Sequence, residues 1–474
     1  MFLKITPKHV PEIDTGFVSG ALWNRAYRAL CAVTDDAAPL AICLSRPDGS
    51  ASRYHTVCLP HTGAFAALNK VHVERAVKFL LWARGGNKVW LAGRHAAPLA
   101  ELLRDLYTPD GERAFDADFI RKLFDSPPEF VAAATEDALP PDSVAGVPLG
   151  RNLDGCRIGF DLGGSDRKCA ALIDGEVVFS EEVKWDPYFQ TDPQYHYDGI
   201  ADTLRRAAAH LPRVDAIGGS SAGVYINNTT RVASLFRGIT DPVLFEARVK
   251  NIFPEIAREW GVPFEVLNDG DVTALAGSMS MGVNGVLGIS LGTSVAGGYV
   301  DPHGRVTNWL SELAFVPTDY RENAPADEWS GDLGCAVQYF SQQGVGRLLP
   351  LAGIELPAAM KLPERLEALQ TLMASGDPRA RKVYESIGVC FGYYIAQLAE
   401  FYTFGHVLIM GRVSTGDGGG IIIEKARQVL ADEFPELRVK LVVPSEKEKR
   451  HGQAVAAASL PVTQAAKSAS AKQP

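Results

Sequence analysis

Short apolar runs alternate with amphipathic stretches along most of the chain, and this pattern predicts an α/β protein. Over the first 125 residues, strand-like runs such as APLAICLS (38–45) and NKVWLAG (87–93) are mixed with helix-like runs such as VERAVKFLLWARG (73–85). The mixture predicts an accessory α+β domain over residues 1–125, and nothing in its sequence assigns it a role. From residue 155 to about residue 460 the alternation of strands and helices is stronger and more regular.

Segments rich in proline or in small residues mark the expected boundaries. Residues 126–150, SPPEFVAAATEDALPPDSVAGVPLG, are rich in proline and alanine and end in glycine, so we expect a linker over residues 126–154. The C-terminal run TQAAKSASAKQP consists mainly of alanine, serine and lysine, and it predicts a disordered tail over residues 461–474.

One short pattern occurs twice. GFDLGGS (159–165) has the same form as GISLGTS (288–294): each follows an apolar stretch, presents glycine and serine, and continues into a second strand. The second strands end at Asp174-Gly175 and at DPHG (301–304), which are hairpin signals. The sequence therefore predicts a duplicated unit of strand, glycine loop and strand.

Each glycine loop has the composition of a phosphate site or of an ordinary β-turn. Neither matches a Walker A or a dinucleotide-binding loop, because those loops lead from a strand into a helix. Glycines let backbone N–H groups approach phosphate oxygens, and hydroxyls add donors, so two such loops in register favour nucleotide binding. The predicted phosphate-binding residues are Asp161, Gly163, Gly164, Ser165, Lys168, Gly292, Thr293 and Ser294.

A third glycine-rich segment, HVLIMGRVSTGDGGG (406–420), predicts a strand, a turn and a helix. Alone it is equally well explained as a loop whose glycines start a helix. As the third member of the set it predicts a wall for adenosine, with Gly411, Arg412, Gly418 and Gly419 as candidates. Asp161, whose counterpart in the second copy is Ser290, is placed to orient a hydrated Mg²⁺ ion.

Composition and charge narrow the classes of function. The net charge of -9 argues against a nucleic-acid partner, which needs a basic patch. No apolar run approaches the roughly 18 residues of a membrane span, and the start, MFLKITPKHVPEIDTG, lacks the apolar core of a signal peptide. The seven cysteines show no CxxC spacing and favour reduced thiols. We therefore expect a cytoplasmic protein without nucleic-acid or membrane partners. The sequence allows a homodimer but does not require one.

Taken in order, these motifs resemble those of the actin/sugar kinase/Hsp70 superfamily. Within it, residues 157–460 resemble the ROK family of bacterial sugar kinases and repressors, through GFDLGGSDRKCAALIDGEVV, VLNDGDVTALAG, GISLGTSVAGGYV, SGDLGCAVQYFS and VLIMGRV. The resemblance implies a duplicated ribonuclease-H-like (actin-like ATPase) fold with an interlobe cleft. Residues 155–280 would form the first lobe and residues 281–460 the second, with the last helix free to return to the first lobe. ATP as co-substrate, Mg²⁺ and a sugar are the implied partners.

The acceptor side of such a site falls in VPFEVLNDGDVTALAGSMSMG (262–282), which predicts a strand, a polar break and an Ala-rich helix. By resemblance, Asp269 is the catalytic base and Asn268 orients a sugar hydroxyl. A carboxylate beside that hydroxyl can take its proton as the hydroxyl attacks the γ-phosphate. Asp271 has a simpler explanation as the N-cap of the helix, where its charge suits the helix dipole.

By the same resemblance, Glu312 stands where the family has a sugar-binding glutamate, but two other sugar contacts are missing. Phe315 occupies the position of a histidine, and Val337 occupies that of a second glutamate. Buried polar groups decide which sugar isomer a site accepts. The two losses disfavour glucose itself and leave a hexose-like polyol as the expected acceptor class.

The family's zinc cluster is also incomplete here. Only Cys335 persists, with Glu328 and Ser330 near the positions of the other ligands, and one thiol does not make a tetrahedral site, so we expect no zinc. Three further histidines have no partners at ligand spacing and are expected to be surface or core residues: His55, His61 and His196.

The segment IGGSSAGVYINNTTRVASLFRGI (217–239) resembles the loops on the sugar side of the family's site. Ser221, Asn227 and Asn228 are therefore candidate sugar contacts. Turn formers that satisfy their own backbone explain the same residues equally well.

Together these observations predict an ATP-dependent carbohydrate kinase, glucokinase-like, that phosphorylates a hydroxyl of a hexose or hexose derivative. A non-catalytic, DNA-binding sugar sensor of the same family is the first alternative. It would need a basic recognition helix near the start, where acidic runs such as PDGERAFDADF (109–119) occur instead. An actin- or Hsp70-like ATPase is the second alternative, and the Asn268-Asp269 pair and Glu312 disfavour it.

Overall fold

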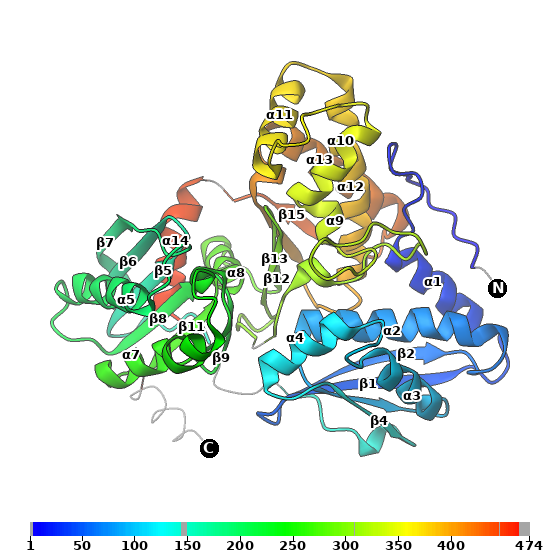
Figure 1. Ribbon diagram of the computed structural model, residues 1–474, viewed down its shortest axis with the longest axis horizontal. Coiled ribbons are helices and arrows are strands. Elements are labelled where there is room, and N and C mark those ends of the chain that lie inside the picture. Colours follow the sequence, from blue (N-terminus) through cyan, green and yellow to red (C-terminus); the bar gives the residue numbers. More distant parts are fainter. Residues whose placement is uncertain (1–2, 144–148, 308, 445, 464–474) are drawn as a thin grey trace.

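The computed structural model describes residues 3–143, 149–307, 309–444 and 446–463. Its strands form two lobes and an additional N-terminal sheet (Figure 1). Residues 144–148 of the predicted linker and the predicted tail from residue 464 onward lie outside the described residues.

The first lobe is built on a five-stranded sheet in the order β11-β8-β5-β6-β7. Strand β5 is buried along its whole length, as expected for a central strand of a sheet covered on both faces, and it pairs in parallel with β8 and antiparallel with β6. Its strands are β5 (Cys156–Leu162), β6 (Asp166–Ile173), β7 (Glu176–Lys184), β8 (Ala216–Ser221) and β11 (Phe264–Asn268), and a separate hairpin comprises β9 (Val224–Ile226) and β10 (Thr229–Val232).

Helices cover both faces of this sheet. The apolar sides of α5 (Pro193–Ala208) and α7 (Ile252–Trp260) pack on one face, and α14 (Glu446–Ala458) packs on the other. A Cβ on Gly159 or Gly218 would lie within 2 Å of a carbonyl oxygen of α14, so these two glycines let the last helix rest directly on the strands. Shorter pieces are α6 (Pro242–Leu244), the π-helix Phe245–Val249 and the 3-10 turn Ser234–Phe236.

The second lobe has a four-stranded sheet in the order β13-β12-β14-β15. Helix α8 (Asp269–Met281) lies against this sheet on the side of the first lobe, and α12 and α13 pack closely on each other through Gly388 and Gly392. The strands are β12 (Val286–Leu291), β13 (Val295–Val300), β14 (His406–Met410) and β15 (Lys440–Val442). The other helices are α9 (Val337–Phe340), α10 (Gln342–Leu351), α11 (Leu362–Ala374), α12 (Pro378–Leu398) and α13 (Gly416–Glu433), with 3-10 turns at Leu313–Phe315 and Arg412–Ser414.

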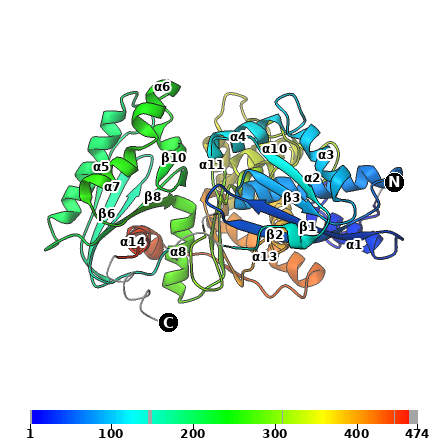
Figure 2. The same ribbon diagram turned by 90° about the horizontal axis from the view of Figure 1, so that it is seen from below.

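The N-terminal sheet has the order β2-β1-β3-β4 and lies beside the second lobe (Figures 1 and 2). Its strands are β1 (Ala38–Ser45), β2 (Ala51–Cys58), β3 (Lys88–Ala92) and β4 (Glu129–Ala133). Its helices are α1 (Gly20–Cys31), α2 (Ala64–Arg84), α3 (Ala96–Leu106) and α4 (Ala114–Phe124), and a 3-10 turn follows at Glu136–Ala138. The linker prediction was wrong at its start, because β4 lies within residues 126–154 and pairs in parallel with β3.

Helix α2 joins the N-terminal sheet and the second lobe into one hydrophobic core. The ring of Phe79 stacks on Phe401 with centroids 3.9 Å apart, and Trp82 lies 4.4 Å from Phe315. Between these contacts, the buried amino group of Lys78 forms ion pairs with Asp116 of α4 and with Asp332 of the second lobe. The N-terminal sheet is therefore a fixed part of the second lobe and not a separate body.

The contact between the N-terminal sheet and the first lobe is smaller. Asp125, at the end of α4, accepts a hydrogen bond of 2.6 Å from Arg231 of β10, and Lys250 approaches the same carboxylate at 3.9 Å.

All seven cysteines are buried and unpaired. None of the described helices combines the length and apolar character that a membrane span requires.

Candidate functional site

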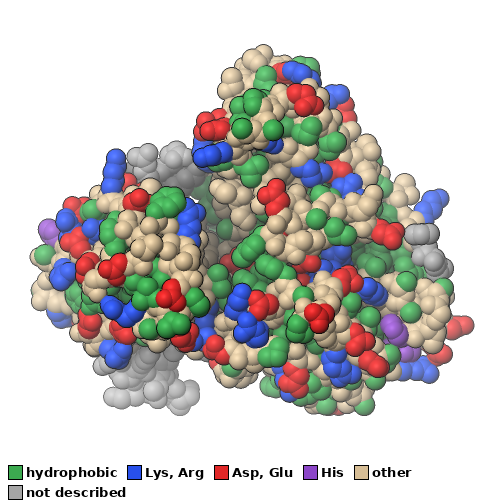
Figure 3. Space-filling view, in the orientation of Figure 1, with side chains coloured by type: hydrophobic (Ala, Val, Ile, Leu, Met, Phe, Trp, Pro, Cys, Tyr) green, Lys and Arg blue, Asp and Glu red, His purple; other side chains and the backbone are tan. Residues whose placement is uncertain are grey.

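Polar side chains gather at the carboxyl ends of three neighbouring parallel strands of the first lobe. Asp161 of β5 pairs in register with Ser220 of β8, and Ser221 pairs with Asn268 of β11. In open α/β sheets, ligands bind outside the carboxyl ends of the strands. On the face drawn in Figure 3, a deep recess separates the first lobe from the second lobe and the N-terminal sheet.

Asp161 is a buried carboxylate with few partners. Ser220 donates a hydrogen bond of 2.7 Å to Oδ1, and the Nζ of Lys168 lies 3.7 Å from Oδ2. Burial raises the pKa of Asp161, although Ser220 and Lys168 oppose the shift. Lys168 is also 3.0 Å from Asp166, so the predicted phosphate lysine sits between two carboxylates of its own hairpin. Sequence reasoning missed Ser220, which alternation along β8 places on the same face as Gly218.

The first glycine loop, residues 163–165, is a tight turn between β5 and β6. The N–H of Gly163 bonds to the carbonyl of Asp166, and the hydroxyl of Ser165 bonds to the carboxylate of Asp166. The ring of Tyr188 lies directly against Gly164, where a Cβ would come within 2.2 Å of it. Arg237 in turn lies 3.9 Å from the centroid of that ring. Neither Tyr188 nor Arg237 carries a motif in the sequence, and both were missed.

The second glycine loop, residues 292–294, has the same form between β12 and β13. The N–H of Gly292 bonds to the carbonyl of Ser294, and the carbonyl of Gly292 accepts from the N–H of Gln342 at the start of α10. The side chains of Thr293 and Ser294 are exposed, so their hydroxyls face solvent. Two strand–loop–strand units therefore stand at corresponding places in the two lobes, as the repeated sequence predicts.

The third glycine segment adjoins the second loop. Gly411 has a φ of 94°, and a Cβ there would lie 2.4 Å from the carbonyl oxygen of Leu291, the last residue before the second loop. Gly418 and Gly419 lie in the first turn of α13, while the side chain of Arg412 pairs with Glu367 at 2.7 Å. The predicted adenosine wall therefore lies beside the predicted phosphate loop.

Asp269 is the first residue of α8, and Asn268 is its N-cap. The Oδ1 of Asn268 accepts from the N–H of Gly270, and its Nδ2 donates to the carbonyl of Gly223. The N-cap role assigned to Asp271 was wrong: its Oδ1 accepts instead from the N–H of Tyr299 on β13, one turn inside the lobe interface. The amide of Asn268 is thus engaged with backbone groups in this structure.

The pKa of Asp269 is shifted from the usual range of an aspartate towards neutral pH. Burial and the charge of Asp161 raise its pKa to about 6. Burial and the charge of Asp269 raise the pKa of Glu312 to about 7, and burial raises that of Asp271 well above its usual range. Asp161, Asp269 and Glu312 therefore form one mutually repelling group at the meeting point of the lobes.

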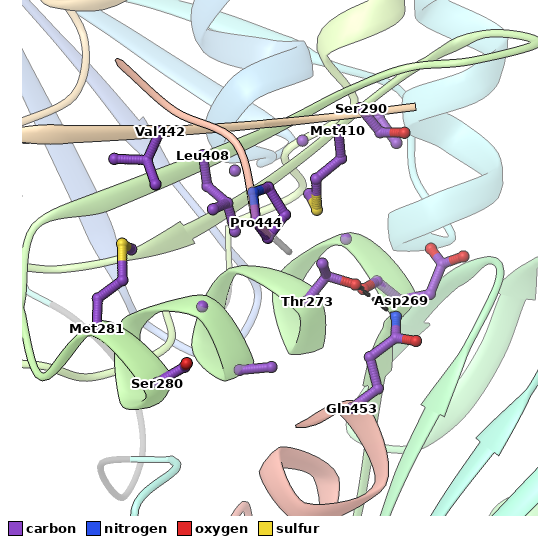
Figure 4. Close-up of a pocket in the computed structure, with 16 residues that line it drawn as sticks. Asp269, Thr273, Ser280, Met281, Ser290, Leu408, Met410, Val442, Pro444 and Gln453 are labelled. Atoms are coloured by element: carbon purple, nitrogen blue, oxygen red, sulfur yellow. Dashed lines mark hydrogen bonds between the residues drawn. The ribbon is translucent and has the colours of Figure 1, made fainter. Parts of the chain in front are cut away.

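A cavity of about 310 Å³ extends from Asp269 along α8 (Figure 4). Leu408 and Met410 of β14 line its opposite side, and Val442 and Pro444 close it. The hydroxyl of Thr273 donates to the backbone carbonyl of Asp269 and accepts from Gln453 of α14. These bonds tie the start of α8 to the last helix, and the cavity walls are mainly apolar.

A second cavity, of about 290 Å³, lies on the other side of the start of α8. Asn268 and Asp271 line it, as do Asn227 and Asn228. Both of these turn residues have positive φ, and the amide of Asn228 bonds to the backbone at Phe264 and Val266. The amide of Asn228 therefore ties the turn to β11 and does not satisfy the turn's own backbone, and the third candidate, Ser221, is buried and accepts a hydrogen bond from Tyr225.

The N-terminal sheet holds the segment that carries Glu312. The N–H groups of Ser311 and Glu312 donate to the carbonyls of Ala83 and Trp82 at the end of α2, at 2.9 and 3.0 Å. Phe315, where the family resemblance expects a histidine, packs on Trp82. Sequence analysis gave residues 1–125 no role, whereas these contacts place the helix behind a candidate sugar residue.

No grouping of three or more His, Cys, Asp or Glu side chains suited to a metal occurs within the described ranges. Cys335 is buried, and its thiol donates to the carbonyl of Asp332 beside Lys78. Of the three histidines, His55 pairs with Glu136, His61 lies 3.4 Å from the amide of Asn69, and His196 is buried.

Comparison with known proteins gives a likeness in structure but not in sequence. No family model matches this sequence, and no curated protein matches it either. A ROK hexokinase from Thermus thermophilus, a solved structure, is 20% identical over 64% of this chain and 96% of its own, with a TM-score of 0.51. The two-lobe, actin-like fold predicted from the sequence is therefore confirmed.

Two further solved structures are similar over the same part of the chain. A ROK family glucokinase from Streptomyces griseus, in complex with glucose and AMPPNP, is 19% identical over 64% of this chain and 98% of its own, with a TM-score of 0.44. A ROK family transcriptional regulator, a homolog of the E. coli MLC protein, is 21% identical over 65% of this chain and 78% of its own, with a TM-score of 0.49. At these scores neither adds to the conclusion about the fold.

Proposed function

We propose that this chain is a ROK-type sugar kinase, which transfers the γ-phosphate of ATP to a hydroxyl of a sugar or sugar-like polyol. One observation carries the proposal: a half-buried carboxylate, Asp269, stands at the interlobe end of α8 with its pKa raised to about 6. A general base works best with a pKa near the operating pH. The hexokinase of the same fold agrees with this activity.

The chain's own groups would act as follows. The glycine loops present N–H groups and the hydroxyls of Ser165, Thr293 and Ser294 to the phosphates of ATP. The acceptor hydroxyl gives its proton to Asp269 as its oxygen bonds to the γ-phosphorus, and the bond from that phosphorus to the β-γ bridging oxygen breaks to release ADP. Closure of the lobes would exclude water from the transfer.

Asp161 would hold a hydrated Mg²⁺ ion through water. Its carboxylate fits this role, because it is buried at the strand ends and Oδ2 has only a distant contact with Lys168, 3.7 Å away. Magnesium commonly uses one or two carboxylates together with waters and phosphate oxygens. When bound, the ion neutralises charge on the β- and γ-phosphates.

The test is phosphate transfer from ATP across a panel of hexoses and polyols, comparing the wild type with Asp269→Asn. Loss of the general base should lower kcat by about 10²–10⁴-fold while ATP binding persists. Asp377→Asn makes the same chemical change at the N-cap of α12, where asparagine caps as well as aspartate, and should leave kcat unchanged. Full activity of Asp269→Asn would exclude it as the base. A wild type that binds sugar without transfer would favour a sensor.

A further inference from the structure

The cavity of about 290 Å³ has walls from three parts of the molecule. The N-terminal sheet supplies the β1–β2 turn and the ends of α2 and α4, the first lobe supplies β11 and the β9–β10 hairpin, and the second lobe supplies Thr307, Trp309 and Leu310. Asn268 and Asp271, on either side of Asp269 in the chain, line its inner end. A ligand here would therefore reach from the N-terminal sheet to the residues flanking the base.

Several buried donors on this wall have no hydrogen-bond partner among the residues that the structure describes. The Nε of Arg84, the Nε of Arg231 and the hydroxyl of Thr307 form no hydrogen bond, although Arg84 is only 9% exposed and Thr307 only 3%. A buried donor without an acceptor costs free energy, so such groups usually mark a bound ligand or water. All three can donate, and the group that satisfies them must be rich in acceptor oxygens.

Two arginines on this wall are buried, and nearby carboxylates offset the cost of burying their charge only in part. The carboxylates whose charges act on them are Asp48, which lies beside Arg46 in the β1–β2 turn, and Asp142. Arg46 bonds to the carbonyl of Arg84 and to serine hydroxyls, while Arg84 bonds to the carbonyls of Arg53 and Phe401. Burial lowers the pKa of Arg46 to about 10 and also lowers that of Arg84, although these carboxylates oppose the shift.

The acidic side chains on the wall restrict where an anion can lie. Asp125 is paired with Arg231, Asp271 has a pKa well above its usual range, and the Oδ1 of Asp48 accepts from the N–H and hydroxyl of Ser50. Glu265 also lines the cavity. The favourable place for a negative group is therefore the side of Arg84 and Thr307, away from β11.

The same side offers an aromatic surface. The guanidinium of Arg84 lies 4.6 Å from the centroid of Trp309, which stacks on Tyr299. We propose that this cavity is the acceptor site and that the acceptor is a polyol bearing a carboxylate or phosphate group, held by Arg84 and Thr307 while its hydroxyl end lies at Asn268 and Asp271, the residues that flank Asp269. The assignment of the acceptor class rests on the proposed kinase function, and it gives the N-terminal sheet a part in substrate selection.

Binding measured apart from phosphate transfer tests the inference. Calorimetric titration of the full-length protein with glucose, glucuronate, glucose 6-phosphate and inorganic phosphate, at low and high salt, separates neutral, carboxylate and phosphate ligands. We expect at least one of the two anionic sugars to bind ten or more times tighter than glucose, with a preference that weakens as salt rises. Equal affinity for glucose and both anionic sugars would overturn the inference, as would binding of none of them.

Variants of the wall refine the test. Thr307→Val removes an unpartnered hydroxyl with little change of shape, so the fold should persist while affinity for the anionic sugar falls about fivefold or more. Thr318→Val removes another buried, unpartnered hydroxyl that does not line the cavity, and should leave affinity unchanged. Arg84→Lys should weaken the anionic sugar more than glucose. Identical behaviour of the Thr307 and Thr318 variants would contradict the site.

The two proposals can fail separately. Tight binding of an anionic sugar without phosphate transfer from ATP would support the proposed acceptor site and contradict the proposed kinase activity. Phosphate transfer to neutral sugars with no preference for anionic ones would support the proposed kinase activity and contradict the proposal of an anionic acceptor.

Discussion

The hairpin β5–β6 of the first lobe and the hairpin β12–β13 of the second share one backbone design but differ in charge. Each turns through a glycine loop closed by a bond from its first glycine N–H, to the carbonyl of Asp166 in the first loop and to that of Ser294 in the second. One residue before each strand ends, the first hairpin has the buried carboxylate of Asp161, while the second has Ser290. The loops also differ at the next glycine position, because the ring of Tyr188 lies on Gly164 whereas the second loop has Thr293 there, with its side chain exposed.

The difference shows what duplication supplies and what it does not. Repeating the hairpin gives two glycine loops, one in the sheet of each lobe. Of the two hairpins, only the first carries a buried carboxylate, Asp161, and its charge acts on Asp269, where β11 leads into α8. The second hairpin stays neutral, which suits a place where phosphate oxygens lie against N–H and hydroxyl groups without a repelling carboxylate.

The largest expected effect comes from removing the carboxylate that distinguishes the first hairpin from the second. Asp161→Asn keeps the size of the side chain and an acceptor for Ser220 but removes the charge that would orient Mg²⁺. We expect kcat to fall about 100-fold in a coupled ATP assay. The matched change in the other hairpin, Ser290→Ala, should cost less than about threefold. Equal losses in the two hairpins would contradict the division of labour between them.

A second comparison uses the loops themselves. Gly164→Ala would place a methyl group 2.2 Å from the ring of Tyr188, so the ring and the loop must shift. We expect the KM for ATP to rise about tenfold and the melting temperature to fall. Gly292→Ala meets open space and has no positive φ, so both values should change little. Initial-rate kinetics and thermal denaturation measure the two effects together.

A third, smaller effect concerns pH. A base must be ionised, so kcat/KM for the acceptor should rise as pH increases through about 6 and then level off. Because burial and the charge of Asp161 both raise the pKa of Asp269, Asp161→Asn should move this limb to lower pH by about half a unit to one unit. Ser290→Ala should leave the limb in place. A limb that does not move in either variant would show that Asp161 and Asp269 are not coupled.

The smallest expected effect is on stability. The pKa of Asp161 is raised in the folded state, so its contribution to stability is present below about pH 4 and is lost as pH rises through the folded pKa. At pH 7.5 the ionised carboxylate is destabilising, and Asp161→Asn should raise the melting temperature by about 2–4 °C. The gain should shrink towards pH 4. Ser290→Ala should not show this pH-dependent gain.

Local sequence patterns predicted the parts of the site that depend on local structure. A strand, glycines and a second strand are sufficient to form each loop, because turn chemistry acts over a few residues. The cap of α8 shows where this reasoning stops. Asn268 and Asp271 are both good N-caps by residue type, and the choice between them depends on the N–H of Tyr299, which approaches from another strand.

Contacts distant in the chain were the part that could not be predicted. The start of the proposed linker has the composition of a loop, yet β4 forms there because β3 offers a free edge for pairing. Nothing near Trp82 or Phe79 in the sequence indicates that their partners are Phe315 and Phe401. Such a pairing depends on three-dimensional packing between segments more than two hundred residues apart. The local periodicity of the sequence therefore does not predict it.

The shared core of helix α2 and the second lobe has a practical consequence for anyone who shortens this chain. A fragment trimmed to the length of the similar kinases would begin after β4 and would lose Lys78, Phe79 and Trp82. Asp332 would then lose its buried counterion, and Phe315 and Phe401 would become open to water. Such a fragment should aggregate, and the shortest soluble form of this protein should retain its N-terminal sheet.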